Sequence, residues 1–268
     1  MILYLIRHGQ SVNNLLGEST LTSSGEFDEN AFKTYMSSRV ADPPLTEIGQ
    51  RQAERLAVFL REARPKHRAT HDDPPEDALR GTDVVNRLGI SRIYCSPTLR
   101  TLQTTRPSAT ALGLRPEVWV DLHEHGGIFD NSGPDGSVVG KSGLTRSEMA
   151  ALYPDYTLDE RIRENGWWFG GEEDRPDCDA RAARVDARLR QMAKEIGDER
   201  IAVVVHGTFM DSLLKAILGR LPGNEFHISH YNTAITRVDY TMSWRDKTPL
   251  LLIRYTNRVD HLTPDLIT

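Results

Sequence analysis

Apolar positions along the chain follow two alternating patterns. Short, almost uninterrupted apolar runs are typical of strands covered on both faces, and apolar residues three or four positions apart are typical of amphipathic helices. We expect strands at residues 2–6, 90–95, 117–120, 201–205, 234–240 and 250–255, the last two towards a sheet edge. We expect helices from Thr46 onward, after Pro97, and over residues 179–196 and 209–218. This alternation predicts an α/β fold, a three-layer α/β/α sandwich around a mainly parallel sheet.

Three segments depart from this alternation, at residues 15–44, 63–86 and 129–177. They are rich in polar residues, glycine and proline, and the third contains a patch formed by Trp167, Trp168 and Phe169. We interpret these segments as insertions that cover part of the core, and the aromatic patch as packing within one of them. No sharp boundary divides the chain, so we expect one domain over residues 1–268 with three insertions.

Composition narrows the class of protein. The chain has 38% hydrophobic and 26% charged residues, which suits a globular core, and its net charge of −5 does not favour nucleic acid or an anionic membrane as partner. No apolar run approaches the ~20 residues of a membrane span, and the apolar start of the chain is too short for a secretory signal. Two cysteines, Cys95 and Cys178, do not suggest a disulfide framework. We therefore expect a cytoplasmic protein.

Polar side chains follow four of the predicted strands, where each strand ends. In parallel sheets such residues gather at the carboxyl edge, where ligands bind. The four groups are Arg7 with His8, Ser96 with Arg100, His123 with Glu124, and His206 with Gly207 and Thr208. Together they would form one site containing two arginines, at least two histidines and a glutamate.

These residue types suit transfer of a phosphoryl group from a small phosphorylated metabolite. Guanidinium groups of Arg7 and Arg100 match phosphate geometry, and fixed cations stabilise the charge on a phosphoryl group in transfer. A neutral imidazole of His8 can attack phosphorus, and Glu124 can give a proton to the leaving alkoxide. The arginines and His206 supply positive charge, so we expect neither a metal nor a cofactor.

Four sequence segments resemble the signatures of the histidine-phosphatase, or phosphoglycerate-mutase-like, superfamily. Residues 5–11 read LIRHGQS, residues 45–53 read LTEIGQRQA, residues 96–104 read SPTLRTLQT, and residues 204–207 read VVHG. They are similar, in family order, to its Arg-His-Gly segment, its L-T-x-x-G-x-x-Q-A and S-x-x-x-R-x-x-Q-T segments, and its late His-Gly pair. One such match is weak, whereas all of them in order, each near a predicted strand, are specific.

The resemblance implies a role for each matching residue. His8 would be the transiently phosphorylated nucleophile, with Arg7, Arg100 and His206 around the phosphoryl group and Glu124 as the acid. It also implies further phosphate ligands at Ser11, Asn14, Gly207 and Thr208. Ser11 and Thr208 could equally be turn or cap residues.

Three alternatives stay open at this point. A phosphoglycerate mutase would use the same intermediate, although residues 125–127, read HGG, lack the arginine and aromatic residue that mutases carry after the acid. A catalytically silent, protein-binding family member is a second alternative, which the intact set of site residues disfavours. The spacings of His123 with His125 and of His227 with His230 would suit a metal, but no acidic or cysteine cluster completes such a site.

Overall fold

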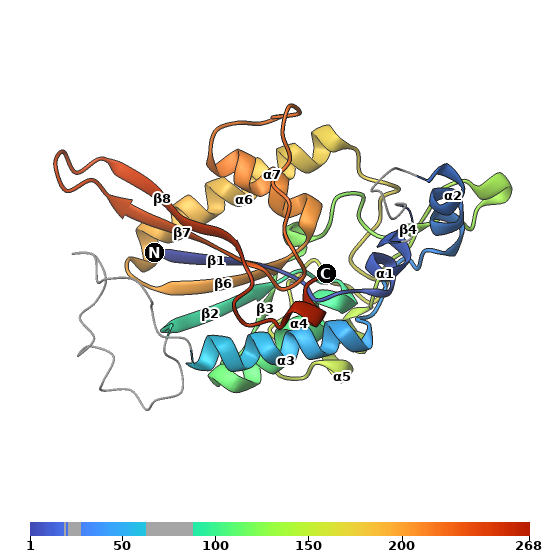
Figure 1. The fold of residues 1–268 in the computed structure, drawn as a ribbon, viewed down its shortest axis with the longest axis horizontal. Coiled ribbons are helices and arrows are strands. Elements are labelled where there is room, and N and C mark those ends of the chain that lie inside the picture. Colours follow the sequence, from blue (N-terminus) through green and yellow to red (C-terminus); the bar gives the residue numbers. More distant parts are fainter. Residues whose placement is uncertain (19, 21–27, 63–87) are drawn as a thin grey trace.

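The computed structural model of the protein, which describes residues 1–18, 20, 28–62 and 88–268, has a central six-stranded sheet (Figure 1). The strand order is β3-β2-β6-β1-β7-β8. Strands β1, β6, β2 and β3 are parallel, whereas β7 and β8 are antiparallel and complete one edge. The strands span β1 Ile2–Arg7, β2 Ile90–Cys95, β3 Glu117–Val118, β6 Arg200–Val205, β7 Ile235–Met242 and β8 Pro249–Arg258. The predicted mainly parallel sheet is confirmed.

Helices cover both faces of this sheet (Figure 1). Successive side chains of a strand point to opposite faces. Leu3 and Leu5 of β1 therefore join a core with α6 (Arg175–Ile196) and α7 (Gly207–Ile217). Tyr4 and Ile6 join a second core with α3 (Glu47–Glu62) and α4 (Leu99–Leu112). The three-layer sandwich is thus confirmed.

Two predicted elements have different bounds in the structure. Helix α6 begins at Arg175 rather than near residue 179, because the Asp174 side chain accepts a hydrogen bond from the Asp177 amide at 2.8 Å and caps the helix. The predicted strand 117–120 is shorter, because the Asp159 carboxylate accepts the Val120 amide at 3.0 Å. A 3₁₀ turn, Val120–Leu122, follows there in place of a longer strand.

Two of the three segments that depart from the alternation contain regular structure of their own. The first includes most of α1 (Val12–Glu18) and all of α2 (Glu29–Ser38). The last contains the two-stranded sheet of β4 (Phe129–Asp130) and β5 (Val139–Gly140), a 3₁₀ turn, Pro134–Gly136, and α5 (Arg146–Leu152). A final 3₁₀ turn, Pro264–Leu266, lies near the end of the chain. The predicted insertion at residues 63–86 lies outside the described residues.

Segments 15–44 and 129–177 meet beyond the carboxyl end of β1, where Figure 1 shows α1, α2 and β4 together. The Asn131 amide nitrogen donates a hydrogen bond to the carbonyl of Met36 at 2.8 Å, and the Arg39 guanidinium stacks on the Phe129 ring.

In the aromatic patch, Trp167 is buried but Phe169 is 63% exposed. Across the parts of the chain that are described, no helix is both long and apolar enough to cross a membrane.

Candidate active site

The loop that follows β1 carries His8 and is fixed by side chains from two of the sequence signatures. The Gly9 amide donates to Thr104 Oγ1 at 3.0 Å, and the Gln10 amide donates to Gln52 Oε1 at 2.7 Å. Asn232, on the loop before β7, donates from Nδ2 to the His8 carbonyl at 2.9 Å. Gln52 and Thr104 therefore position the loop rather than bind a ligand themselves.

The His8 ring has a defined tautomer. Its Nδ1 lies 2.6 Å from the Gly9 carbonyl, which can only accept, so Nδ1 carries the proton. Nε2 then holds the lone pair and accepts a hydrogen bond from Arg100 Nε at 3.2 Å. Burial, and then the charges of Arg100 and Arg7, hold the pKa of His8 well below its ordinary value. The imidazole is thus neutral at neutral pH, as a nucleophile must be.

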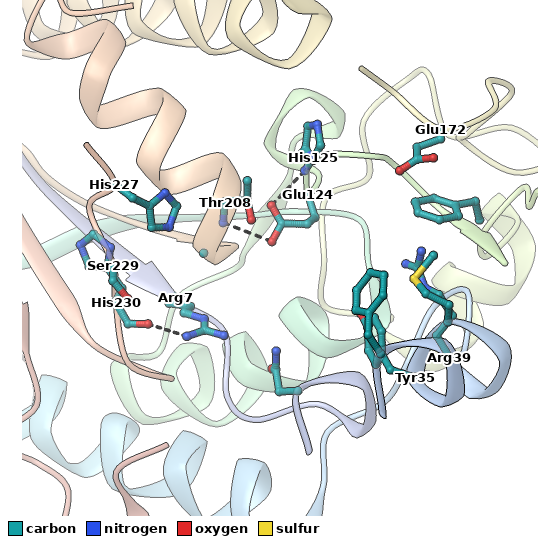
Figure 2. Close-up of a pocket in the computed structure, with 15 residues that line it drawn as sticks. Arg7, Tyr35, Arg39, Glu124, His125, Glu172, Thr208, His227, Ser229 and His230 are labelled. Carbon is teal, nitrogen blue, oxygen red and sulfur yellow. Dashed lines mark hydrogen bonds between the residues drawn. The ribbon is translucent and has the colours of Figure 1, made fainter. Parts of the chain in front are cut away.

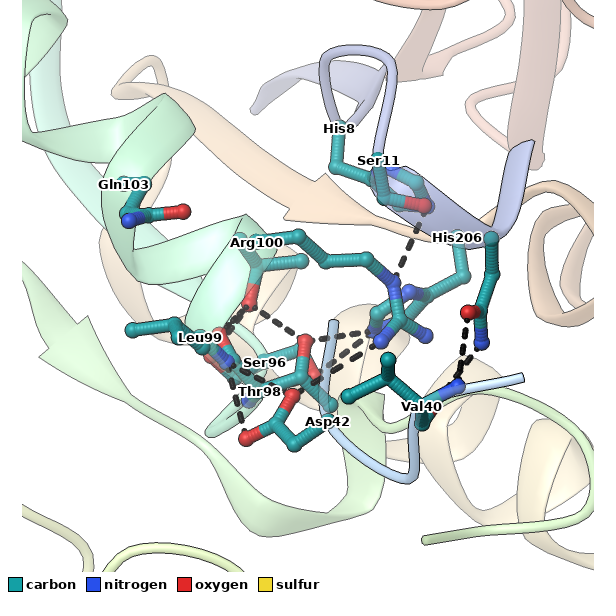
Figure 3. Close-up of polar contacts among 12 residues, drawn as sticks. His8, Ser11, Val40, Asp42, Ser96, Thr98, Leu99, Arg100, Gln103 and His206 are labelled. Atoms are coloured by element: carbon teal, nitrogen blue, oxygen red, sulfur yellow. Dashed lines mark hydrogen bonds and ion pairs between the residues drawn. The ribbon is translucent and has the colours of Figure 1, made fainter. Parts of the chain in front are cut away.

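Arg100 reaches the site from the first turn of α4 and lies between His8 and Asp42 (Figure 3). Its Nη1 is 3.8 Å from Asp42 Oδ1, while both Asp42 oxygens accept the Leu99 amide, at 3.0 and 3.1 Å. Burial raises the pKa of Asp42 to about 6, although the Arg100 charge opposes that rise. Asp42 both caps α4 and orients its arginine, and the sequence motifs did not single it out.

His206 is fully buried at the end of β6. Its ring meets that of His8 edge-on, with centroids 5.1 Å apart, and its Nε2 lies 2.8 Å from Ser96 Oγ. Burial, followed by the charge of Arg100, holds the pKa of His206 well below its ordinary value. Among the described residues, its Nδ1 is buried without a hydrogen-bond partner.

Arg7 ends β1 and points into an open pocket (Figure 2). Its Nη1 donates to the carbonyl of His230, while its Nε is buried and has no hydrogen-bond partner within the described parts of the chain. Gly207 lies against it, since a Cβ at that position would be 3.3 Å from Arg7 Nε. Gly207 thus allows the arginine to lie close to the start of α7.

Glu124 binds the amino end of α7. Its Oε1 accepts the amides of Phe209 at 2.8 Å and of His125 at 2.9 Å. Its Oε2 has one longer contact, 3.4 Å from the Thr208 amide. Oε2 is therefore the oxygen better able to exchange a proton with a ligand, and the Thr208 amide faces this carboxylate.

Ser11 and Asn14 bind each other at the start of α1. Ser11 Oγ accepts the Asn14 amide at 3.3 Å and donates to Asn14 Oδ1 at 3.1 Å, as a helix cap does. Asn232 Nδ2 also reaches Asn14 Oδ1, at 3.3 Å. Asn14 lines the pocket and, with its oxygen so engaged, can offer its Nδ2 group to an anion. The buried Ser11 does not line it.

The pocket has a volume of about 480 Å³, and Figure 2 shows the residues that line it. The sequence-predicted residues that line it are Arg7, Asn14, Glu124, Gly207 and Thr208. His8, Arg100 and His206 are not among its lining residues and are 3%, 8% and 0% exposed. The structure therefore brings the predicted set to one edge of the sheet, where His8 and His206 are buried beside Arg100.

Arg181 is a further residue that sequence reasoning missed. This buried α6 side chain donates from Nη1 to the carbonyls of Asp121 and His123, both at 2.8 Å, and pairs with Glu173 at 2.6 Å. It thereby fixes the loop that carries Glu124. No short motif could have identified it, because its partners are backbone carbonyls of a distant segment.

The histidines that suggested a metal have other partners, although His125, His227 and His230 all line the pocket. His123 is buried, edge-on to Trp168 at 4.8 Å between ring centroids, whereas His125 lines the pocket. His230 Nε2 lies 2.8 Å from Thr236 Oγ1, and His227 Nδ1 lies 3.1 Å from an Asp211 oxygen. Among the described residues, no group of three or more His, Cys, Asp or Glu side chains is arranged to hold a metal ion.

Solved structures share this fold over nearly the whole chain. Mycobacterial glucosyl-3-phosphoglycerate phosphatase, solved with VO3, is 21% identical, with a TM-score of 0.52 over 96% of this chain and 99% of that chain. Alpha-ribazole phosphatase from Shigella flexneri is 19% identical, with a TM-score of 0.54 over 96% of both chains. Phosphoserine phosphatase from Entamoeba histolytica is 17% identical, with a TM-score of 0.50 over 98% of this chain and 99% of that chain.

Sequence comparison gives the family. No curated protein matches the sequence. The family model of the histidine phosphatase superfamily (branch 1) matches residues 76–246, well over half of the 268 residues, although this range does not include Arg7 and His8. The chain therefore belongs to branch 1 of the histidine phosphatase superfamily.

Proposed function

We propose that the protein hydrolyses small phosphate monoesters through a phosphohistidine intermediate on His8. The observation that carries this proposal is a set of unsatisfied donors beside a neutral histidine. Arg7 Nε and His206 Nδ1 are buried without hydrogen-bond partners among the described residues, and Arg100 donates to His8 Nε2 while its contact with Asp42 is long, at 3.8 Å. A buried donor without a partner is costly, and a phosphoryl group would supply oxygens to Arg7 Nε and, in the tautomer that carries its proton on Nδ1, to His206.

The first half of the reaction transfers the phosphoryl group to the enzyme. Substrate oxygens attract the Arg100 guanidinium and release the lone pair of His8 Nε2. That lone pair forms a bond to phosphorus while the ester P–O bond breaks, and Arg7 and Arg100 stabilise the equatorial charge. Protonated Glu124 gives its proton from Oε2 to the leaving oxygen, so that a neutral alcohol departs.

The second half returns the enzyme to its starting state. A water molecule gives a proton to the Glu124 carboxylate and attacks phosphorus, and the P–N bond breaks. Inorganic phosphate leaves, His8 Nε2 regains its lone pair, and Glu124 is protonated again. Charge stabilisation comes from arginines throughout, so the cycle requires no metal or cofactor.

Phosphoglycerate mutase is the alternative use of the same intermediate. Mutases hold the substrate by an arginine and an aromatic residue after the acid, and here Gly126 and Gly127 occupy that stretch. Gly127 has φ +73°, and a Cβ there would lie 2.3 Å from the Trp168 ring, so the indole of Trp168 takes the space of a side chain. This arrangement supports hydrolysis over retention of the substrate.

The test of the proposal is turnover of p-nitrophenyl phosphate and of a panel of phosphorylated metabolites. Wild-type protein should release phosphate, and the His8→Ala variant should release none while remaining folded by circular dichroism. No release by wild-type protein would favour the silent, protein-binding alternative. Rapid conversion of 3-phosphoglycerate to 2-phosphoglycerate with added 2,3-bisphosphoglycerate, outpacing phosphate release, would favour the mutase.

A further inference from the structure

The pocket extends well beyond the phosphate-binding residues. Figure 2 shows Arg7 and His230 at one end, Glu124 between, and Arg39 with Tyr35 at the opposite end. The far end is formed by segments 15–44 and 129–177, and its lining residues are Phe32, Tyr35, Met36, Arg39, Phe129 and Glu172. A volume of about 480 Å³ falls within the range of pockets that enclose medium-sized organic ligands. It exceeds what a phosphoryl group alone would fill.

Arg39 is the cation at this far end, and the charges of Glu172 and Asp130 act on it without a direct ion pair among the described residues. Its guanidinium carbon lies 3.7 Å from the centre of the Phe129 ring, and its Nε is buried with no hydrogen-bond partner among the described residues. It forms no ion pair within the described parts of the chain, since nearby Asp130 pairs with Lys141 at 3.2 Å. A partly buried cation without an ion-pair partner is unfavourable. Because the Arg39 guanidinium stacks on the Phe129 ring by its face, the N–H groups along its edge can still bind a planar anion.

The charge balance at this end favours a singly charged group. Glu172 is exposed and lines the same end, so a dianion such as a second phosphate would be repelled by it. A carboxylate has one charge and two coplanar oxygens that match a guanidinium. The ring of Phe129 and the side chains of Phe32 and Met36 belong to this same end, and they favour an apolar portion of the ligand next to its anionic group.

We propose that Arg39 binds a carboxylate on the substrate, so that the preferred substrates are phosphate monoesters whose alcohol portion is apolar and ends in a carboxylate. This inference rests on the proposed phosphatase function and identifies its substrate class. Arg39 is a specificity-determining residue in this scheme, and it takes no part in the chemical step.

The experiment compares two substrates that differ by one charge: 3-(4-phosphonooxyphenyl)propanoate and its methyl ester. Both release nearly the same phenol, so the chemical step is matched. Wild-type kcat/KM should favour the carboxylate by about 10- to 100-fold, mainly through KM, as expected for a charge-assisted pair. Arg39→Gln should reduce this preference to near one while keeping turnover of the ester within about twofold of wild type.

Three variants serve as controls. Arg39→Lys should retain part of the preference, because it keeps the charge. Lys33→Gln removes an exposed cation of α2 that pairs with Glu29 at 2.9 Å, and it should leave the preference unchanged. Asn131→Ala removes the 2.8 Å hydrogen bond to Met36 between the two segments without changing any charge, and it too should leave the preference unchanged.

The outcomes separate this inference from the function on which it rests. Phosphate release from both esters with equal kcat/KM, or an unchanged preference in Arg39→Gln, would overturn the role of Arg39 and leave the phosphatase standing. An equal loss of preference in Asn131→Ala would assign the effect to the arrangement of the two segments and would also overturn it. Release from neither ester would overturn the phosphatase itself.

Discussion

The residues around His8 differ in charge and in the contacts that hold them. His8, the proposed nucleophile, is neutral because burial and two arginines lower its pKa, whereas Glu124 is held by backbone amides at a helix start. The Asp42 carboxylate lies next to Arg100, with its Oδ1 3.8 Å from Arg100 Nη1. One prediction tests whether Glu124 donates a proton to the leaving group. A second tests whether the raised pKa of Asp42 makes stability depend on pH.

The Glu124→Gln variant should slow substrates according to their leaving group. An alkoxide needs a proton to leave, whereas nitrophenolate does not, so loss of the acid should cost about 10²- to 10⁴-fold with alkyl phosphates and far less with p-nitrophenyl phosphate. Steady-state kinetics on both substrates measures the difference. Equal slowing of the two would mean that Glu124 organises the site without donating the proton.

Asp42 should make stability depend on pH. Its pKa is about 6 in the folded protein and 3.8 is its ordinary value, so the folded state binds more protons between these two values. The contribution of Asp42 to stability is therefore present below pH 3.8 and is lost as pH rises towards about 6.

The Asp42→Asn variant removes this titration and keeps an acceptor for the Leu99 amide. Relative to wild type, it should gain on the order of 2–3 kcal/mol in free energy of unfolding between pH 4 and pH 7. Urea unfolding of both proteins at the two pH values provides the measurement. A difference that does not change with pH would contradict the raised pKa.

Among the structural elements, the β1–α1 loop and α3 approach each other so closely that only glycine fits. A Cβ on Gly9 would lie 2.6 Å from the Gly49 carbonyl oxygen, and one on Gly49 would lie 2.1 Å from that of Gln10. These contacts are between backbones, which cannot move aside as a flexible side chain can. The loop that carries His8 therefore has its position set by α3.

Gly9→Ala should shift this loop, with a loss of about 1–3 kcal/mol in stability and a large loss of activity. Gly171→Ala is the matched control, because a Cβ there would meet nothing within 4 Å. Thermal unfolding and p-nitrophenyl phosphate turnover check both variants. Normal activity in Gly9→Ala would show that the loop need not be held so closely.

The elements also show where sequence reasoning succeeds. Strands β1 and β6 were predictable because both their faces are buried, and α3 because its apolar residues recur on one face. Helix α5 was missed because it is short, although Thr145 and Glu148 form a capping box that could have revealed it. The length of β3 could not be predicted, since its end depends on Asp159, far away in sequence.

Some residues of the candidate site could be predicted from the sequence, and others could not. Arg7, His8, Arg100 and His206 were predictable because they lie at or just after strand ends, where backbone direction alone brings them together. Asp42, Arg181 and Asn232 act through contacts with residues distant in the sequence, and no local pattern marks such partners.

On the scale of the whole molecule, four strand-end segments meet segments 15–44 and 129–177 at one edge of the sheet. The net charge is −5, yet the end of the pocket that we propose to bind phosphate holds arginine and histidine side chains. Local cations rather than overall charge must therefore attract an anionic substrate.

The arginines should also make activity independent of added metal. Phosphate release should persist after thorough treatment with EDTA, because Arg7 and Arg100 supply the charge that stabilises the transferring group. Activity lost on chelation and restored by zinc or magnesium would instead indicate a metal-dependent reaction. The assay is p-nitrophenyl phosphate turnover before and after chelation and metal addition.

The central claim is that His8 carries the phosphoryl group during turnover, and trapping that intermediate tests it most directly. Wild-type protein is mixed with a ³²P-labelled phosphate monoester, quenched within one turnover, and the labelled peptide is mapped. We predict phosphate that is labile to acid and stable to base, attached to His8 and missing from the His8→Ala variant. Label on a serine, or normal turnover with no labelled protein, would contradict the account.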